Sequence, residues 1–202
     1  MDYLAFTARR RPTTRQLLVG AATSVSVAYG DYHADFASCA PMRPVAPELK
    51  KALKSNFALM DNGKPFAHIR NELMAANGAR CPLCANGTVA TLDHYLPRAS
   101  FPEFSILATN LVPCCERCNR IKGEKLKRAD GARFLHAYFD RLPDAELLVA
   151  EVDTTELVAV DFSVVHDKSV PIEEYLNLHY HFEALSPFQP GGERARRCTA
   201  WR

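Results

Sequence analysis

The sequence has almost no net charge, no long apolar run and no internal repeat. Its 202 residues carry 25 lysines and arginines against 23 aspartates and glutamates, a formal charge of +2, so no overall basic field points to nucleic acid. The longest apolar stretch, near the N-terminus, is too short to span a membrane. Because 48% of the residues are hydrophobic and 24% charged, a disordered chain is also excluded, and we expect one globular domain with no membrane partner.

The sequence also has too few spare cysteines for a disulfide framework. Four of the seven cysteines form two closely spaced pairs, which leaves Cys39, Cys114 and Cys198 as plain thiols. This usage fits a reducing compartment, so we expect a cytoplasmic protein. Arg9, Arg10 and Arg11 precede the apolar stretch as they would in an export signal, but no small-residue cleavage site follows. We interpret Leu17 to Ala22 as part of the opening helix of the fold.

The two cysteine pairs predict a structural zinc site. Cys81 and Cys84 are separated by two residues, as are Cys115 and Cys118, and this spacing lets two consecutive thiolates bind one tetrahedral ion. Cys114 is an alternative ligand, but the two-residue spacing to Cys118 favours Cys115. We therefore expect Zn2+ bound by four thiolates.

A set of polar residues lies between and directly after these pairs. Asp93 and His94 end the extended run that starts at Thr88, Asn110 precedes the second pair, and Asn119 follows it at the start of a basic helix. A zinc ribbon that only folds a small domain and binds a partner would need the cysteines alone. This simpler interpretation leaves the polar residues unexplained.

The segment from Cys81 to Leu126 resembles the HNH nucleases, whose core is the ββα-metal finger. The resemblance rests on Asp-His-Tyr-Leu-Pro at residues 93–97, on Asn-Leu-Val-Pro at residues 110–113 and on Cys-Glu-Arg-Cys-Asn-Arg-Ile-Lys-Gly at residues 115–123. It is closest to the zinc-stapled bacterial members. The family is named after three motif residues. The third of them, often histidine, corresponds to Asn119 here, and many members also carry asparagine at this position.

The resemblance implies a metal-dependent endonuclease that hydrolyses DNA phosphodiester bonds. His94 would be the general base, Asn110 would orient it, and Asp93 with Asn119 would hold a divalent ion. The residue types suit this chemistry, since imidazole can deprotonate water near neutral pH and oxygen donors favour Mg2+ or Mn2+. A silent zinc module that binds nucleic acid or protein remains an alternative, as does a nuclease that acts on RNA.

Local basic charge supports a nucleic-acid partner, most simply duplex DNA. The stretch from Cys115 to Arg133 holds seven basic residues against three acidic ones, and a helix so charged could contact phosphates, although a solvated helix face is as plausible for each residue. No base-reading element is visible, so we expect weak sequence preference. The candidate phosphate contacts are Arg98, Arg117, Arg120, Lys122 and Lys125.

The rest of the chain predicts an α+β fold around this core. Residues 1–77 should form helices, one of them beginning at Pro47, and residues 78–130 the nuclease core. Residues 131–188 should form a β-hairpin turning at residues 153–155 and a helix opened by Pro171, and residues 189–202 a flexible tail. His136 is expected to pack rather than to act, and His179 and His181 are spaced wrongly for a helical metal site.

The resemblance also implies a biological setting. Small bacterial proteins of this type are often effectors of restriction or anti-phage systems, sometimes beside an ATPase that controls them. We therefore expect a regulatory ATPase or sensor protein as a partner.

Overall fold

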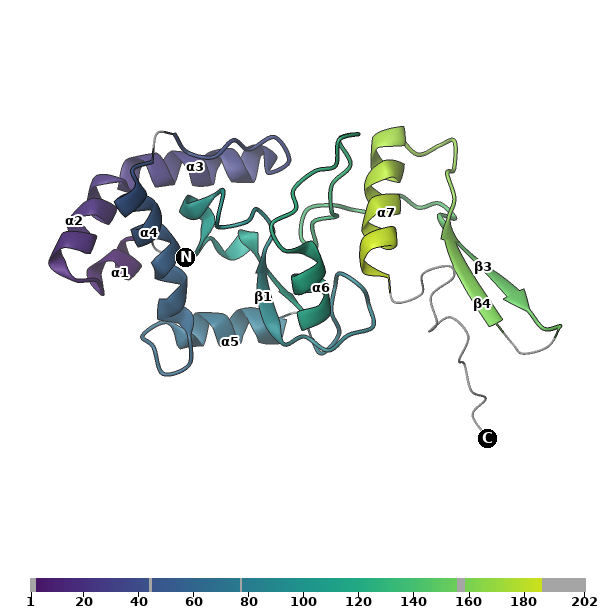
Figure 1. Ribbon diagram of the computed structural model, residues 1–202, viewed down its shortest axis with the longest axis horizontal. Coiled ribbons are helices and arrows are strands. Elements are labelled where there is room, and N and C mark those ends of the chain that lie inside the picture. Colours follow the sequence, from purple (N-terminus) through teal and green to yellow (C-terminus); the bar gives the residue numbers. More distant parts are fainter. Residues whose placement is uncertain (1–2, 44, 77, 156–158, 187–202) are drawn as a thin grey trace.

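The computed structural model describes residues 3–43, 45–76, 78–155 and 159–186. Within these ranges the chain forms seven α-helices and two small antiparallel sheets, which confirms the predicted α+β class (Figure 1). No helix in the described ranges combines the length and the apolar composition needed to cross a bilayer.

Helices make up the N-terminal third of the chain. They are α1 (Tyr3–Ala8), α2 (Pro12–Gly20), α3 (Ala22–Asp35), α4 (Pro47–Ser55) and α5 (Ala67–Ala76), with a 3-10 helix η1 (Asn56–Met60) between the last two. Pro47 begins α4 as predicted, because its ring fits the first turn of a helix. The apolar stretch Leu17–Ala22 spans the end of α2 and the start of α3, where Leu18 and Ala21 are buried.

A β-hairpin followed by a helix forms the centre of the molecule. Strand β1 (Thr91–His94) pairs antiparallel with β2 (Leu111–Cys114), in a register that places Asp93 opposite Val112 and His94 opposite Leu111. Two 3-10 turns, η2 (Pro102–Phe104) and η3 (Ala108–Asn110), lie in the connection between the strands. Helix α6 (Glu116–Lys122) follows directly and contacts β1.

The structure corrects the expected extent of the basic helix. Asn119 lies in the middle of α6 rather than at its start, because Cys115 is the N-cap and accepts the Cys118 N–H on its Sγ atom at 3.5 Å. The helix ends at Lys122, since Gly123 adopts a positive φ of 50°. Lys125 and the basic residues after it therefore lie in an irregular segment.

The C-terminal part contains the predicted hairpin and helix. Strand β3 (Leu148–Asp153) pairs with β4 (Ala159–Val164), and α7 (Ile172–Leu185) begins after Pro171. The hairpin projects from the molecule, whereas α7 packs beside α6 (Figure 1). The expected flexible tail 189–202, Cys198 and the hairpin residue Val158 lie outside the described residues.

One buried cluster joins the central unit to its flanking helices. Tyr32 of α3, Val112 of β2, Cys118 of α6 and Leu185 of α7 are members of it, and each is almost fully buried. A second cluster joins α1, α2 and α4 to β1 through Leu92. The ββα unit therefore shares its core with helices from both ends of the chain.

Candidate metal centre and active site

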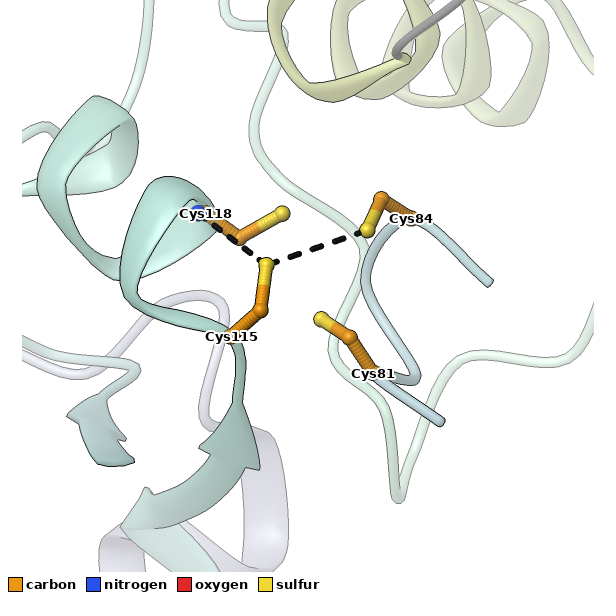
Figure 2. A group of neighbouring side chains, drawn as sticks. All are labelled: Cys81, Cys84, Cys115 and Cys118. Atoms are coloured by element: carbon orange, nitrogen blue, oxygen red, sulfur yellow. Dashed lines mark hydrogen bonds between the residues drawn. The ribbon is translucent and has the colours of Figure 1, made fainter. Parts of the chain in front are cut away.

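Four cysteine sulfurs gather where the first cysteine pair faces the start of α6. The Sγ atoms of Cys81, Cys84, Cys115 and Cys118 all lie within 4.8 Å of one another (Figure 2). Four thiols at this separation form a cluster that could bind zinc. Cys114 is buried but is not part of the cluster, so the structure selects Cys115 as the sequence spacing predicted.

Local backbone geometry brings the two pairs together. The Cys81 N–H donates to the Gly87 carbonyl at 2.7 Å, which closes the first turn, and Ala85 adopts a positive φ of 55° within it. A Cβ atom on Gly87 would lie 2.7 Å from both Cβ and Sγ of Cys115. Only glycine therefore allows this turn to approach the second pair so closely. A hydrogen bond from Cys118 lowers the pKa of the Cys81 thiol, which favours a thiolate in the cluster.

A separate pocket of about 310 Å³ collects three of the four predicted catalytic residues. Asp93 and His94 line it from the end of β1, and Asn119 lines it from α6. The Asn119 amide nitrogen donates to the hydroxyl of Thr91 at 3.1 Å, which fixes the orientation of the side chain. The ββα unit thus brings residues 26 positions apart in the chain to one cavity.

The environment of His94 defines its tautomer. Its Nε2 atom lies 3.0 Å from the carbonyl oxygen of Ser105, and because a carbonyl only accepts, Nε2 carries the proton. The Nδ1 atom then holds the free lone pair of a neutral imidazole. Burial lowers the pKa of His94 to about 4, so this neutral form prevails at pH 7. The ring also packs against Phe57, with centroids 4.6 Å apart.

Asp93 forms a buried ion pair. Its Oδ2 atom lies 2.9 Å from Nζ of Lys122, and both side chains are almost inaccessible to solvent, at 4% and 2%. Burial raises the pKa of Asp93, whereas the Lys122 ammonium opposes that shift. Lys122 also donates to the His94 carbonyl at 2.8 Å. This placement corrects the expectation that Lys122 contacts phosphate at the surface, because its ammonium is directed inward.

Asn110 holds the backbone around His94 rather than the imidazole itself. Its Oδ1 atom accepts the Leu96 N–H at 2.8 Å, and its Nδ2 atom donates to the carbonyls of Leu96 at 3.1 Å and Phe104 at 3.3 Å. Phe104 directly precedes Ser105, whose carbonyl binds the imidazole. Asn110 therefore fixes two backbone segments that determine how His94 is oriented.

The remaining basic candidates divide into two groups. Arg117 donates to the carbonyls of Leu185 and Ser186, so it ties α6 to the end of α7. The side chains of Arg98, Arg120 and Lys125 are exposed. Arg98 lines the pocket, with its guanidinium 5.3 Å from the centre of the Phe57 ring.

Sequence reasoning missed the roles of three residues at this site. Lys122 was assigned to DNA, although its position three residues after Asn119 places both on one side of α6. Ser105 contributes a backbone carbonyl, and such a role leaves no signal in the side-chain pattern. Glu124 also lines the pocket and was not singled out.

His136, His179 and His181 do not line the pocket that contains His94. His136 is buried among aromatic rings, as expected, and its Nε2 atom lies 2.8 Å from the Tyr32 hydroxyl. His181 binds the Leu83 carbonyl beside the first cysteine pair, whereas His179 pairs with Glu183. His179 and His181 therefore do not converge, in agreement with the expectation from their spacing.

Comparison with known proteins gives limited information. No family model matches the chain, and no solved structure matches it. The chain is 34% identical over 96 residues to "Protein ea31" of Escherichia phage lambda, a match that covers 46% of this chain and 32% of that protein. The matched region therefore spans about a third of the length of the curated relative.

Proposed function

We propose that this protein is a metal-dependent endonuclease of the HNH type that hydrolyses DNA phosphodiester bonds. The observation that carries the proposal is the convergence of Asp93, His94 and Asn119 on one pocket, built by a β-hairpin and the helix that follows it. A protein that used this unit only as a scaffold for zinc would have no need of this convergence.

His94 has the chemistry of a general base. Its Nδ1 lone pair can take a proton from water, and the Ser105 carbonyl stabilises the positive charge that the imidazole then carries. The activated water attacks the scissile phosphorus and the bond from phosphorus to the 3′ oxygen breaks. The 3′ oxygen takes a proton from solvent, so the products on the family pattern are a 3′-hydroxyl and a 5′-phosphate. Asn110 keeps the imidazole aligned through the backbone that it binds.

The pocket fits a hard divalent cation. Asp93 and Asn119 offer a carboxylate and an amide oxygen, donors that suit Mg2+ or Mn2+. When bound there, the ion would stabilise charge on the phosphorane and on the leaving oxygen. Because the Lys122 ammonium pairs with Asp93 in this structure, cation binding requires that this pair opens or shares the carboxylate.

The four-cysteine cluster would hold structural Zn2+. All four donors are thiols, and zinc in such closed sites supports folding rather than chemistry. Zinc prefers soft thiolates and Mg2+ prefers oxygen donors, so the two metals would bind at separate sites.

The biological setting is proposed from the family resemblance. It includes duplex DNA as substrate, a cytoplasmic location, a regulatory ATPase or sensor as partner, and a role in bacterial restriction or anti-phage defence. The similar protein comes from phage lambda, so a role in a phage is as compatible with the comparison as a role in defence.

The test is cleavage of supercoiled plasmid with Mg2+, with Mn2+ and with EDTA. We expect metal-dependent nicking or linearisation that is abolished in His94→Ala and retained in His179→Ala, which replaces an exposed histidine on α7. Both variants should keep the zinc content and circular dichroism of the wild type. A fully active His94→Ala protein would refute the assignment.

A silent zinc module is the second candidate, and one observation favours it. Asp93 is engaged by Lys122, and only 9% of the His94 surface is exposed, so both groups are largely withdrawn from solvent. A folded, zinc-loaded protein that binds nucleic acid but cleaves neither duplex DNA, single-stranded DNA nor RNA under any of the metal conditions would establish this alternative.

A further inference from the structure

A second cavity, distinct from the catalytic pocket, is lined by Lys122, the residue that pairs with Asp93. Its volume is about 350 Å³, and it is lined by residues 36–39 after α3, by the segment after β1 and by the irregular segment after α6. This volume lies within the range of cavities that bind small molecules, roughly 300–1,000 Å³.

The walls of this cavity are rich in aromatic rings. Phe36, Tyr95, Phe101 and Phe134 all line it, and the Phe36 and Tyr95 rings meet edge to face with centroids 5.4 Å apart. Three of the four are buried in the main core, so their positions are fixed by packing. A rigid aromatic wall favours a flat ligand, because stacking then costs little conformational entropy.

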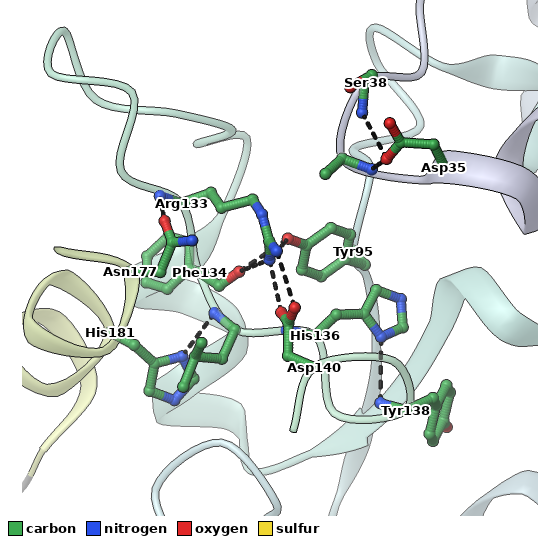
Figure 3. A network of polar contacts seen from close by, with 12 residues as sticks. Asp35, Ser38, Tyr95, Arg133, Phe134, His136, Tyr138, Asp140, Asn177 and His181 are labelled. Atoms are coloured by element: carbon green, nitrogen blue, oxygen red, sulfur yellow. Dashed lines mark hydrogen bonds and ion pairs between the residues drawn. The ribbon is translucent and has the colours of Figure 1, made fainter. Parts of the chain in front are cut away.

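The lining is cationic. Lys122, Lys125, Lys127 and Arg133 border the cavity, and none of the described lining residues carries a carboxylate. Arg133 is already paired with both oxygens of Asp140, at 2.5 and 2.8 Å (Figure 3). Its guanidinium also lies 4.9 Å from the Phe36 ring centre. Lys122 is likewise paired with Asp93. Lys125 and Lys127 form no salt bridge within the described part of the chain, so they supply the positive charge that is available to a ligand.

These two lysines lie at the solvent edge of the cavity. Both are exposed, and Lys125 donates to the Ile121 carbonyl at 2.8 Å, a contact that leaves its positive charge unbalanced. Asp35, at the end of α3, is an acidic group close enough to Lys127 to interact with it. The cavity thus combines apolar aromatic walls with positive charge at its mouth.

We propose that this cavity binds a nucleotide unit, with its base against the aromatic walls and its phosphate at Lys125 and Lys127. A purely apolar ligand would not use the lysines, and an inorganic anion would not use the rings. A ligand with a planar aromatic part and an anionic part satisfies both. The unit can come from a free nucleoside monophosphate or from one nucleotide of a bound strand.

The position of Lys122 connects this site to the catalytic pocket. The Lys122 side chain lines the cavity, and its ammonium contacts the Asp93 carboxylate and the His94 carbonyl. An occupant would therefore touch the residue that neutralises Asp93. The proposal does not depend on nuclease activity, since binding can be measured in a protein that does not cleave.

The experiment uses full-length His94→Ala protein without added divalent ion and a fluorescent base. 2-Aminopurine riboside 5′-monophosphate is titrated, and separately an oligonucleotide that contains one 2-aminopurine, because stacking on an aromatic side chain quenches the base. Lys127→Glu should weaken the quenching by about tenfold, as loss of a phosphate contact does. Lys168→Glu makes the same charge change on an exposed loop and should leave it unchanged.

A second variant tests the position of the base. Ser38 lines the cavity and is exposed, so Ser38→Leu should fill the mouth with a side chain that does not quench, without disturbing the core, and it should abolish quenching. Saturable quenching of the free monophosphate identifies a free nucleotide as the ligand, and quenching only in the oligonucleotide identifies a strand. Absence of quenching with both probes, or quenching that neither Lys127→Glu nor Ser38→Leu changes, would overturn the proposal.

Discussion

Burial of histidines is one source of pH sensitivity at the level of single residues. Burial lowers the pKa of His94 and His136 to about 4 and lowers that of His181 as well. At His136 the hydrogen bonds agree with the neutral form, since Nδ1 accepts the Tyr138 N–H at 3.2 Å and would lose this bond on protonation. Asp140 raises the pKa of His136, whereas Arg133 and Lys122 lower it.

We predict that stability falls as the pH drops below about 6.5, the pKa of an unfolded histidine. Between that pH and the folded pKa of about 4, the unfolded chain binds a proton that the folded His136 does not, so acid favours unfolding. From pH 7.5 to 5.5, His136 alone should account for about 1 kcal/mol of lost unfolding free energy.

Urea unfolding of the wild type and of His136→Gln at both pH values measures this contribution. Loss of metal in acid affects the two proteins equally, so the difference between their pH dependences isolates the histidine. Equal dependences would show that His136 is not held neutral.

The ion pair between Lys122 and Asp93 gives a second prediction at this scale. Lys122→Met should destabilise the protein by roughly 3–5 kcal/mol, because it leaves a carboxylate buried without its partner. Adding Asp93→Asn to this variant should restore much of the loss, since no buried charge then remains. Unfolding free energies of the two single variants and of the double variant test the coupling, and additive effects would contradict it.

The residues that meet at the site could be predicted from the sequence, but the groups that these residues contact could not. Asp93, His94 and Asn119 were recognised from residue type and spacing, and the structure brings them to one pocket. The inward direction of Lys122 could not be predicted, because a lysine on a short basic helix usually faces solvent. The Ser105 carbonyl was missed because any residue type can supply it.

At the scale of elements, Gly87 and Gly30 differ in the space that surrounds them, so the same substitution by alanine should have opposite effects at the two positions. Gly87 approaches Cys115 so closely that a Cβ atom would lie 2.7 Å from its Cβ and Sγ atoms, whereas a Cβ atom on Gly30 in α3 has no neighbour within 4 Å. We predict that Gly87→Ala separates the cysteine pairs and lowers zinc content. Gly30→Ala should instead stabilise the protein by about 0.5–1 kcal/mol through its higher helix propensity.

Zinc stoichiometry and melting temperature distinguish the two glycine variants. Because both replace glycine with alanine, a difference between them reports the local space rather than the chemical change. Full zinc content in Gly87→Ala would show that the turn can move without loss of the cluster.

Elements with strong local signals could be predicted, and those set by backbone conformation could not. Pro47 and Pro171 marked the starts of α4 and α7, and alternation of apolar residues marked the β3–β4 hairpin. The end of α6 was predicted too late, because basic residues continue past Gly123 and only its positive φ stops the helix. Strand β1 likewise begins at Thr91 rather than at Thr88, within the run expected to be extended.

At the scale of the whole molecule, the cysteine cluster is part of a larger core. Cys81, Cys115 and Cys118 belong to the same buried cluster as Tyr32 of α3 and Leu185 of α7. Arg117 and His181 add polar contacts between α6, α7 and the first cysteine pair. These long-range contacts could not be predicted from local sequence patterns, since each joins segments that are at least 68 residues apart.

We therefore predict that removal of the metal unfolds most of the molecule rather than one loop. Structural zinc supplies about 10–16 kcal/mol of apparent binding free energy, which equals or exceeds the roughly 5–15 kcal/mol of net stability of a typical domain. Cys81→Ser or Cys118→Ser should lose zinc, helical circular dichroism and protease resistance together. Cys39→Ser lies outside the cluster and should retain all three. If Cys81→Ser lost zinc but kept a cooperative unfolding transition, the shared core rather than the metal would hold α3 and α7 in place.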